Sequence, residues 1–392
     1  MAVALPEELI EFKLRTKIIY RVGAVEEIPY ELEELGVKRL VIFTDPGVVK
    51  AGNLDYVREA LEGSGITIVG VFDKVRENVP ASVVNEGARF LKQVGGDGIL
   101  SVGGGSVMDT AKGVNVLVSG GEEDIAGHVG AEVLGKPMLP HVAVPTTSGT
   151  GCEVVWGAII KNEEEQTKSG FIEWYSAADV AILDPYVTKP MPPRLTASTG
   201  MDALTHAIEA YTSPYANPLA DAMSLHAMRL VGRWLREAVN NGDNLEARAY
   251  MMFAACGAGI GFFNTMCGAV HACAHALGGM FDIPHGVANT VMLPVVMDYN
   301  KDYCAERYRD VAEAMGVDVS GMSEEQGAEA AVGAVRDLIT DCGLPTTLGE
   351  YGIREEDLPL LAEKAEQDVQ MLFNPRPAGR EEIMELFRSV LG

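Results

Sequence analysis

Residues 96–118 read GDGILSVGGGSVMDTAKGVNVLV, and this stretch determines the fold class. A short apolar run at 98–102 passes through three glycines into a segment with helical spacing, which predicts a strand, a tight turn and a helix. The exposed N–H groups of such a turn, together with the helix N-terminus, could hold a phosphate. The turn is not the GxGxxG fingerprint, because Met108 stands where the third glycine belongs. Taken alone, a turn of this kind is more often a plain strand–helix connection.

The alternation of strand and helix extends over the first half of the chain. Apolar runs predict further strands at 37–45, 65–72, 141–147 and 178–185, and helical spacing predicts a further helix at 82–94. Strand–helix alternation is typical of a parallel sheet covered by helices. We therefore expect an α/β unit over residues 1–188.

From about Pro190 the pattern changes. The stretch PMPPRLTASTG (190–200) predicts a turn-rich joint, and no convincing strand follows it. Helical spacing is found at 199–212, 219–240, 244–265, 268–279, 289–299, 303–315, 324–342 and 381–391. The prediction is an all-helical second domain over residues 189–392.

A second turn strengthens the phosphate interpretation. PTTSGTG (145–151) also follows a predicted strand, offers hydroxyls and free N–H groups, and could lie beside the first turn. Asp45 ends the strand at 37–45, where a carboxylate could bind both ribose hydroxyls of an adenosine and repel a 2′-phosphate. Asp45 could equally be the first residue of an Asp-Pro-Gly turn.

Histidines with helical spacing suggest a metal site. Asp202 and His206 are four residues apart, as are His271 and His275, and residues four apart share a helix face. His285 follows closely, and no charged residue lies between Arg248 and Asp282. Several imidazoles in an uncharged, buried region are best explained by a divalent metal between two helices. His275 could be a fifth ligand or a neighbouring group that relays protons.

The composition excludes several functions. Net charge is −25, from 31 basic and 56 acidic residues, which disfavours nucleic acid and anionic membranes as partners. The uncharged segment 249–270 could span a bilayer by length, but its Gly, Ala, Asn and Thr favour a helix buried among other helices. Six cysteines without CxxC spacing indicate reduced thiols, and MAVALPEELIEFK lacks the pattern of a signal peptide. A cytoplasmic location is therefore expected.

Four motifs together resemble the iron-containing, or group III, alcohol dehydrogenases. These motifs are GGGSVMDTAK (103–112), PTTSGTGCEV (145–154), GMDALTHAIEAY (200–211) and GAVHACAHALGGMFDIPHG (268–286). The resemblance covers nearly the whole chain and implies an N-terminal Rossmann-like domain for a nicotinamide cofactor. It also implies a helical metal-binding domain, with the substrate in the cleft between the two domains.

The resemblance assigns roles to particular residues. The implied metal ligands are Asp202, His206, His271 and His285. The implied cofactor contacts are Asp45, Gly104, Gly105, Ser106, Thr146, Thr147, Ser148, Thr150, Lys168 and Leu183. His275 matches a histidine near the nicotinamide and substrate, and is the candidate catalytic group for passing a proton to solvent. The segment 171–180 departs from the family pattern, which tends to have proline near Ala178.

Other residues near these motifs allow two readings. Asp109 and Lys112 belong to the glycine motif without an assigned role. Phe262 and Phe263 could line a substrate pocket or belong to the core. Cys267 and Cys273 flank His271 in the sequence and are expected to be core residues.

The expected reaction is hydride transfer between NAD(H), with NADP as an alternative, and a short-chain primary alcohol or diol and its aldehyde. The metal, which could be Fe(II), Zn or Mn, is expected to bind the alkoxide or carbonyl oxygen. Alternatives are a zinc polyol dehydrogenase of the glycerol type, a hydroxyacid dehydrogenase or transhydrogenase, a dehydroquinate-synthase-like lyase, and a non-catalytic relative. The resemblance further suggests a homo-oligomer, as a dimer or a multiple of dimers.

Overall fold

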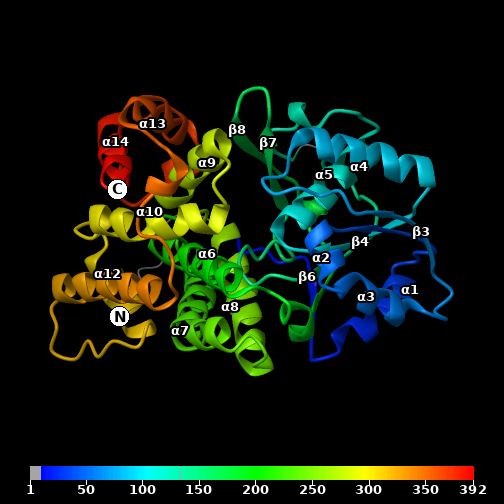
Figure 1. Ribbon diagram of the computed structural model, residues 1–392, viewed down its shortest axis with the longest axis horizontal. Helices are drawn as coiled ribbons and strands as arrows, with labels where there is room; N and C mark the ends of the chain where they lie inside the picture. The colour runs from blue at the N-terminus through cyan, green and yellow to red at the C-terminus, as the bar shows by residue number, and fades with distance from the viewer. Residues whose placement is uncertain (1–9, 133) are drawn as a thin grey trace.

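A parallel sheet on one side and a group of helices on the other make up the molecule in Figure 1. The computed structural model describes residues 10–132 and 134–392. Residues 1–9, which belong to the predicted first domain, and Val133 lie outside the described residues.

The main sheet has six parallel strands in the order β1-β9-β6-β4-β2-β3. Its strands are β1 (Lys17–Tyr20), β2 (Arg39–Phe43), β3 (Thr67–Phe72), β4 (Gly98–Gly103), β6 (His141–Pro145) and β9 (Val180–Leu183). The five strands predicted from apolar runs are all present. The sequence did not predict β1, which is short and only partly buried.

Helices cover both faces of this sheet, as its buried strands require. Alternate residues of β2 show the division. Leu40 and Ile42 pack in the apolar cluster that contains Leu32 and Val57, from the helices of the first face. Val41 and Phe43 pack in the cluster that α4 and α5 build on the other face. The covering helices are α1 (Ile28–Glu34), α2 (Pro46–Lys50), α3 (Asn53–Leu61), α4 (Ala81–Val94) and α5 (Gly105–Gly120).

A second, three-stranded sheet was not predicted. It has the order β5-β8-β7, with bounds β5 (Gly130–Ala131), β7 (Gly157–Asn162) and β8 (Thr167–Ile172). Strands β7 and β8 form an antiparallel hairpin that lies beside α9 in Figure 1. Its strands are short and mostly half-buried, so their apolar pattern is weak.

The second half of the chain is mostly helical, as predicted, although the sequence did not predict the helix at 358–367. Its α-helices are α6 (Pro193–Thr212), α7 (Pro218–Asn240), α8 (Leu245–Phe263), α9 (Ala269–Phe281), α10 (His285–Asn300), α11 (Ala305–Ala314), α12 (Glu324–Asp341), α13 (Leu358–Gln367) and α14 (Arg380–Arg388).

Two further details differ from the prediction. The joint predicted at 190–200 is shorter, because α6 already begins at Pro193, where a proline's missing N–H and fixed φ suit the first helical position. The segment 249–270 is not one helix, because α8 ends at Phe263 and α9 begins at Ala269. Across residues 10–132 and 134–392, no helix is both long and apolar enough to cross a membrane. All six cysteines are free and buried.

Candidate metal centre and cofactor cleft

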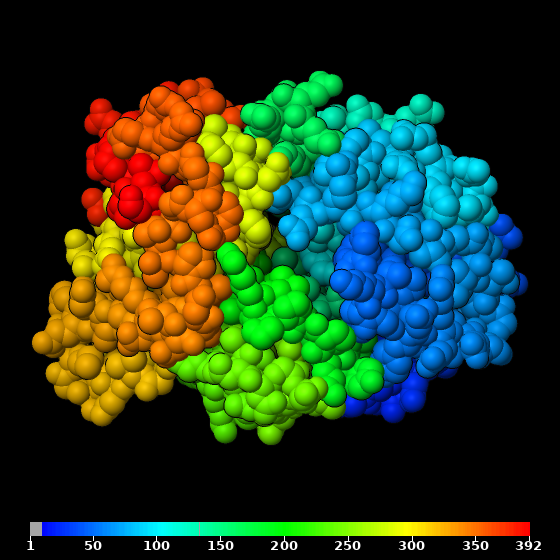
Figure 2. All heavy atoms as spheres, viewed as in Figure 1, coloured from blue at the N-terminus to red at the C-terminus, as the bar shows by residue number. Residues whose placement is uncertain are grey.

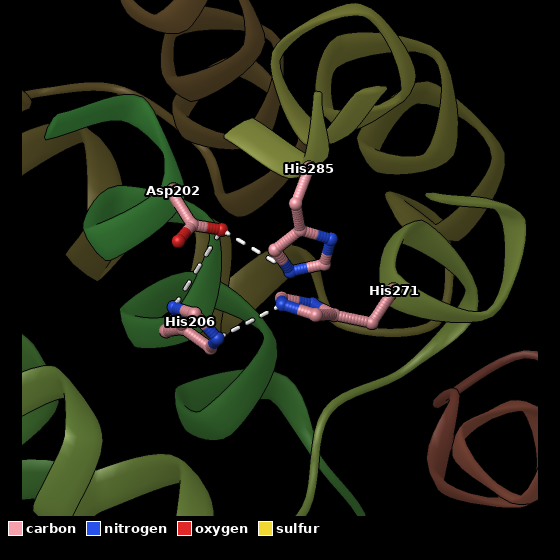
Figure 3. Close-up of side chains that lie close together, drawn as sticks. All are labelled: Asp202, His206, His271 and His285. Carbon is pink, nitrogen blue, oxygen red and sulfur yellow. Dashed lines mark hydrogen bonds and ion pairs between the residues drawn. The ribbon is translucent and has the colours of Figure 1, made fainter. Parts of the chain in front are cut away.

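Four side chains from three helices converge in the helical half. Helix α6 contributes Asp202 and His206, α9 contributes His271, and α10 begins with His285. One ligand atom from each lies within 4.8 Å of the others. The Nε2 atoms of His206 and His271 are 2.9 Å apart, and His285 Nε2 lies 3.6 Å from Asp202 Oδ1 (Figure 3). The structure therefore brings together all four residues predicted as metal ligands.

Local sequence explains how α10 reaches this point. Asp282 adopts a left-handed conformation (φ 54°) that ends α9, and Pro284 precedes the first turn of α10. A Cβ atom on Gly286 would lie 2.5 Å from the carbonyl oxygen of Ser198 on α6. Only glycine permits this approach, so the sequence Ile-Pro-His-Gly places His285 directly against the ligand-bearing face of α6.

Burial keeps these imidazoles neutral. It lowers the pKa of His206 to about 3 and holds the pKa values of His271 and His285 well below their usual range. Burial also raises the pKa of Asp202, whose Oδ1 accepts a 2.6 Å hydrogen bond from Asn289. Three neutral imidazoles and one carboxylate that needs a positive partner form a donor set that fits a divalent transition metal.

His275 lies beside this group but outside it. Its Nδ1 is 2.8 Å from Asp368 Oδ2, and its ring stacks on that of His285 with centroids 5.6 Å apart. If Nδ1 carries the ring proton toward the carboxylate, Nε2 is left as an acceptor. His275 is not among the residues whose ligand atoms lie within 4.8 Å of one another, which favours a neighbouring proton-accepting group over a fifth ligand.

The two turns predicted to bind phosphate lie side by side. Strands β4 and β6 are adjacent, with Gly103 in register with Pro145. The turns fit so closely that a Cβ atom on Gly104 would lie 2.9 Å from Thr147 Oγ1, and one on Gly105 would lie 2.7 Å from the Thr150 methyl group. Both glycines therefore serve the contact between the turns.

The same part of the sheet places four other residues that were predicted to contact the cofactor. Ser106, Thr146 and Ser148 lie in the same two turns at the carboxyl ends of β4 and β6. This is the edge of a parallel sheet where ligands bind in open α/β folds. Leu183 ends β9, the neighbour of β6, but its side chain is fully buried in an apolar cluster with Met252 of α8.

Asp45 is the N-cap of α2. Its Oδ1 accepts hydrogen bonds from the backbone N–H groups of Gly47 (2.7 Å) and Val48 (3.0 Å). The Asp-Pro-Gly turn reading thus describes the local geometry. Recognition of a ribose by the second carboxylate oxygen stays a prediction.

Lys168 lies on the β7–β8 hairpin, which crosses to the helical half. Its Nζ would lie 2.9 Å from a Cβ atom on Gly278 of α9, and Lys161 of the same hairpin pairs with Asp282 at 2.5 Å. Burial, with a smaller contribution from the charge of Lys161, lowers the pKa of Lys168 to about 8. The hairpin therefore brings an ammonium group from the N-terminal half to the helix that carries His271.

The structure gives Asp109 and Lys112 a place. Both are buried on α5, and Lys112 Nζ donates to the carbonyl oxygen of Gly157 (2.9 Å). Asp109 Oδ2 accepts from the N–H of Ile159 (3.1 Å). These two residues of the glycine motif anchor β7, and hence the hairpin that carries Lys168.

The structure also gives different positions to the residues near the motifs for which the sequence left the role open. The ring of Phe262 stacks on His206 with centroids 4.3 Å apart, so it lies against the metal group. Phe263 packs edge-on against Trp156. Cys273 belongs to the helical core, whereas Cys267 lies within 4.8 Å of ligand atoms of Glu209 and His271.

Sequence reasoning missed three polar residues of the site. Glu209 contacts His271, Asn289 contacts Asp202, and Asp368 contacts His275. A signal for Glu209 existed, because it follows His206 by three residues on a helix that is otherwise almost uncharged there. Asp368 lies 93 residues from its partner, and no local pattern links the two.

The surface of the molecule is hollowed between its two halves. On the face shown in Figure 2, a recess lies between the yellow part of the helical half and the blue N-terminal half. The two turns predicted to bind phosphate belong to the N-terminal half, and the four predicted metal ligands belong to the helical half.

Comparisons with known proteins agree with this arrangement. Residues 15–185 match the family described as iron-containing alcohol dehydrogenase, and residues 196–391 match its C-terminal part. The chain is 41% identical to 1,3-propanediol dehydrogenase of Citrobacter freundii, covering 93% of this chain and 95% of that protein. It is 39% identical to lactaldehyde reductase of Escherichia coli K12, covering 94% and 96%. A crystal structure of 1,3-propanediol oxidoreductase superposes with a TM-score of 0.94 at 39% identity, covering 98% of this chain and all of that one.

Proposed function

This chain belongs to the iron-containing alcohol dehydrogenase family, and from its site we propose a metal-dependent enzyme that transfers hydride between NAD(H) and a short-chain primary alcohol or diol. Oxidation of the substrate would yield the aldehyde, and the reverse reaction would reduce it. The observation that carries the proposal is the convergence of three neutral imidazoles and one carboxylate in the helical half of a chain whose other half presents two adjacent turns suited to phosphate.

The proposed metal ligands are Asp202, His206, His271 and His285. The chemistry that a divalent cation supplies when bound there is Lewis acidity, which favours loss of the hydroxyl proton from an alcohol. The chain holds these four donors on three packed helices, so little reorganisation is needed on binding. Phe262 covers one face of His206 and excludes water from that side.

The two turns are the proposed cofactor site. Backbone N–H groups at Gly104, Gly105 and Ser106, at the start of α5, suit a pyrophosphate. The hydroxyls of the second turn, at Thr146, Thr147, Ser148 and Thr150, add further donors. Two more cofactor contacts are proposed, Lys168 near the start of β8 and Leu183 at the end of β9. Lys168 can offer a charge, while Leu183 can offer only its backbone.

His275 is the proposed group that moves the substrate proton. Its Nδ1 faces Asp368 at 2.8 Å, and an imidazole held in this way can accept a proton at Nε2. The carboxylate stabilises the imidazolium that results, because opposite charges then lie in contact. From His275 the proton can pass to solvent in the recess.

The finer assignments are also proposals. Fe(II) is the proposed native metal, with Zn or Mn able to take its place, because imidazole and carboxylate ligands bind all three. NAD is favoured over NADP on account of Asp45. We place the boundary between the two functional units at 188/189, after β9 and the short 3₁₀ turn Pro185–Thr188. A cytoplasmic enzyme acting as a dimer or a multiple of dimers completes the proposal.

An anaerobic reconstitution assay tests this function. The protein is stripped of metal with a chelator, reloaded separately with Fe(II), Zn or Mn, and assayed by absorbance of the reduced cofactor. Substrates are a panel of primary alcohols, diols and aldehydes, each with NAD and NADP. Metal-dependent reduction of NAD is the expected result. Full metal loading without turnover on any substrate would reject the proposed activity.

A further inference from the structure

A buried carboxylate stands directly behind the proposed metal ligands. Glu209 lies one turn after His206 on α6, is only 6% exposed, and is not among the four converging ligands. A buried carboxylate is costly unless its oxygens are bonded, so its partners indicate its role.

Glu209 has two sets of partners, one for each oxygen. Oε1 accepts a 2.8 Å hydrogen bond from the N–H of Val270, in the first turn of α9. Oε2 is bonded to Nδ1 of His271. A Cβ atom on Gly268 would lie 3.0 Å from Oε1, so the missing side chain there lets the carboxylate reach the helix start. One side chain thus fixes both the backbone and the ring of the segment that carries His271.

The bond to Nδ1 decides which nitrogen of His271 is free. In its ionised form Glu209 accepts hydrogen bonds and donates none, so the ring proton of neutral His271 then lies on Nδ1. Burial raises the pKa of Glu209, and the backbone N–H groups at the start of α9, such as that of Val270, favour the ionised form. Nε2 of His271 then carries no proton and has a free lone pair. This atom faces Nε2 of His206 at 2.9 Å. This is the tautomer that a metal ion needs, since only the unprotonated nitrogen can coordinate.

We propose that Glu209 is a positioning residue of the metal centre, which holds His271 in the Nδ1–H tautomer and in the orientation that presents Nε2 to the ion. This inference rests on the proposed function for the identity of the ligand set. Carboxylate partners of metal-bound histidines typically change metal affinity by about 10- to 100-fold. That range is the effect expected here.

A different use of the same residues is a metal site of its own. Glu209, Cys267 and His271 each offer a ligand atom within 4.8 Å of the others. Against this reading, Glu209 Oε2 and His271 Nδ1 are in direct contact, which leaves no space for an ion between them. Burial also raises the pKa of the Cys267 thiol well above its usual range, which disfavours the thiolate that a metal would bind.

Glu209→Gln tests the proposal sharply. The glutamine oxygen can keep the bond to Val270, which directs its NH₂ group at Nδ1 of His271. That NH₂ donates, so it favours the opposite tautomer, with a proton on Nε2 where the ion must bind. Affinity for Zn²⁺, measured on metal-free protein by competition with a chromophoric chelator, should fall by about 10- to 100-fold.

Two matched variants serve as controls. Cys267→Ala should bind Zn²⁺ with an affinity within about threefold of wild type. Loss of a true ligand would lower the affinity by more than about tenfold, or about 1.4 kcal/mol. Glu153→Gln neutralises another buried carboxyl, 3% exposed and outside the metal group, and should also keep wild-type affinity. Wild-type affinity in Glu209→Gln would overturn the proposal. A loss in Cys267→Ala equal to that in Glu209→Gln would assign the ion to the alternative group instead.

A measurement on the unaltered protein covers the case in which Glu209→Gln fails to fold. Nitrogen chemical shifts of ¹⁵N-histidine in the metal-free wild type report the tautomer of each ring, and His271→Asn identifies the signal. The Nδ1–H form is expected, and the Nε2–H form would refute the proposal. Failure of the proposed function looks different, because wild type itself would then bind no metal or show no turnover when loaded.

Discussion

Gly151 is the residue at which the second of the proposed phosphate-binding turns, 145–151, contacts the helical half. Its φ of +62° lies in the left-handed region, and a Cβ atom there would meet Ala255 O at 2.6 Å and Gly259 Cα at 2.7 Å. Both neighbours belong to the backbone of α8, which cannot rotate out of the way. Gly151→Ala must therefore push the turn away from the helix.

The cost of Gly151→Ala has two parts. The left-handed conformation costs an alanine about 1–2 kcal/mol. Overpacking against backbone costs about 1–3 kcal/mol more. Since ordinary contact begins at 3.4 Å, the turn must move by about 0.8 Å, which is enough to break a hydrogen bond of normal length. We expect unfolding free energy to fall by about 2–5 kcal/mol, and the dissociation constant for NAD to rise about tenfold for each bond lost at about 1.4 kcal/mol.

Gly121→Ala is the matched control. Gly121 ends α5 with a φ of +81°, and a Cβ atom there would meet nothing within 4 Å. This variant carries the same backbone strain without the clash, so it should lose only about 1–2 kcal/mol and bind NAD as wild type does. Urea unfolding and NAD titration, each monitored by fluorescence, measure both quantities. Equal losses of stability in the two variants, or unchanged NAD binding in Gly151→Ala, would show that the contact with α8 does not position the turn.

Three further predictions concern cofactor choice, the joint between the halves, and pH. Asp45→Gly should raise the ratio of kcat/KM with NADP to that with NAD about tenfold, or about 1.4 kcal/mol, and should leave α2 intact because glycine is an acceptable N-cap; an unchanged ratio would make Asp45 a turn residue only. Arg248→Met should lower the unfolding free energy by about 2–5 kcal/mol, because the buried guanidinium bonds the carbonyl oxygens of Gly242 and Met191; a loss below about 0.5 kcal/mol in urea unfolding would contradict this. Burial, and to a lesser extent the charge of Lys112, lowers the pKa of His141 to about 3. As pH falls below about 6.5, His141 is therefore protonated in the unfolded chain but stays neutral in the folded chain. The stability contributed by neutral His141 is thus complete above pH 6.5 and is lost as pH falls toward 3; between pH 7 and 5, wild type should lose about 2 kcal/mol more than His141→Gln, and parallel curves would exclude the effect.

Much of the fold could be predicted because the burial of an element in the tertiary structure is reflected in the apolar pattern of its own residues. Strands such as β4 are buried on both faces and read as continuous apolar runs. The hairpin β7–β8 has no such pattern, because it is stabilised by contacts with residues far away in the sequence. Examples are the bond from Lys112 to Gly157 and the ion pair between Lys161 and Asp282.

The proposed metal site likewise has one part that the sequence predicts and another that depends on tertiary packing. Asp202 and His206 could be paired from their spacing alone, since one helix places both on a single face. That α9 and α10 bring His271 and His285 to the same point depends on tertiary packing, and here family resemblance supplied what spacing could not. The supporting residues were missed because their partners lie 62 residues away for Glu209 and 93 for Asp368.

Metal content and turnover in His271→Ala, measured on the same preparation, test the proposed metal centre without an intermediate assumption. Bound metal is determined by mass spectrometry after anaerobic loading with Fe(II), and turnover by absorbance of NADH with a diol substrate. We expect both to be lost together, because His271 is one of the four ligands proposed to hold the ion. An inactive variant that retains full metal occupancy would contradict the ligand assignment. An active variant without metal would contradict the mechanism itself.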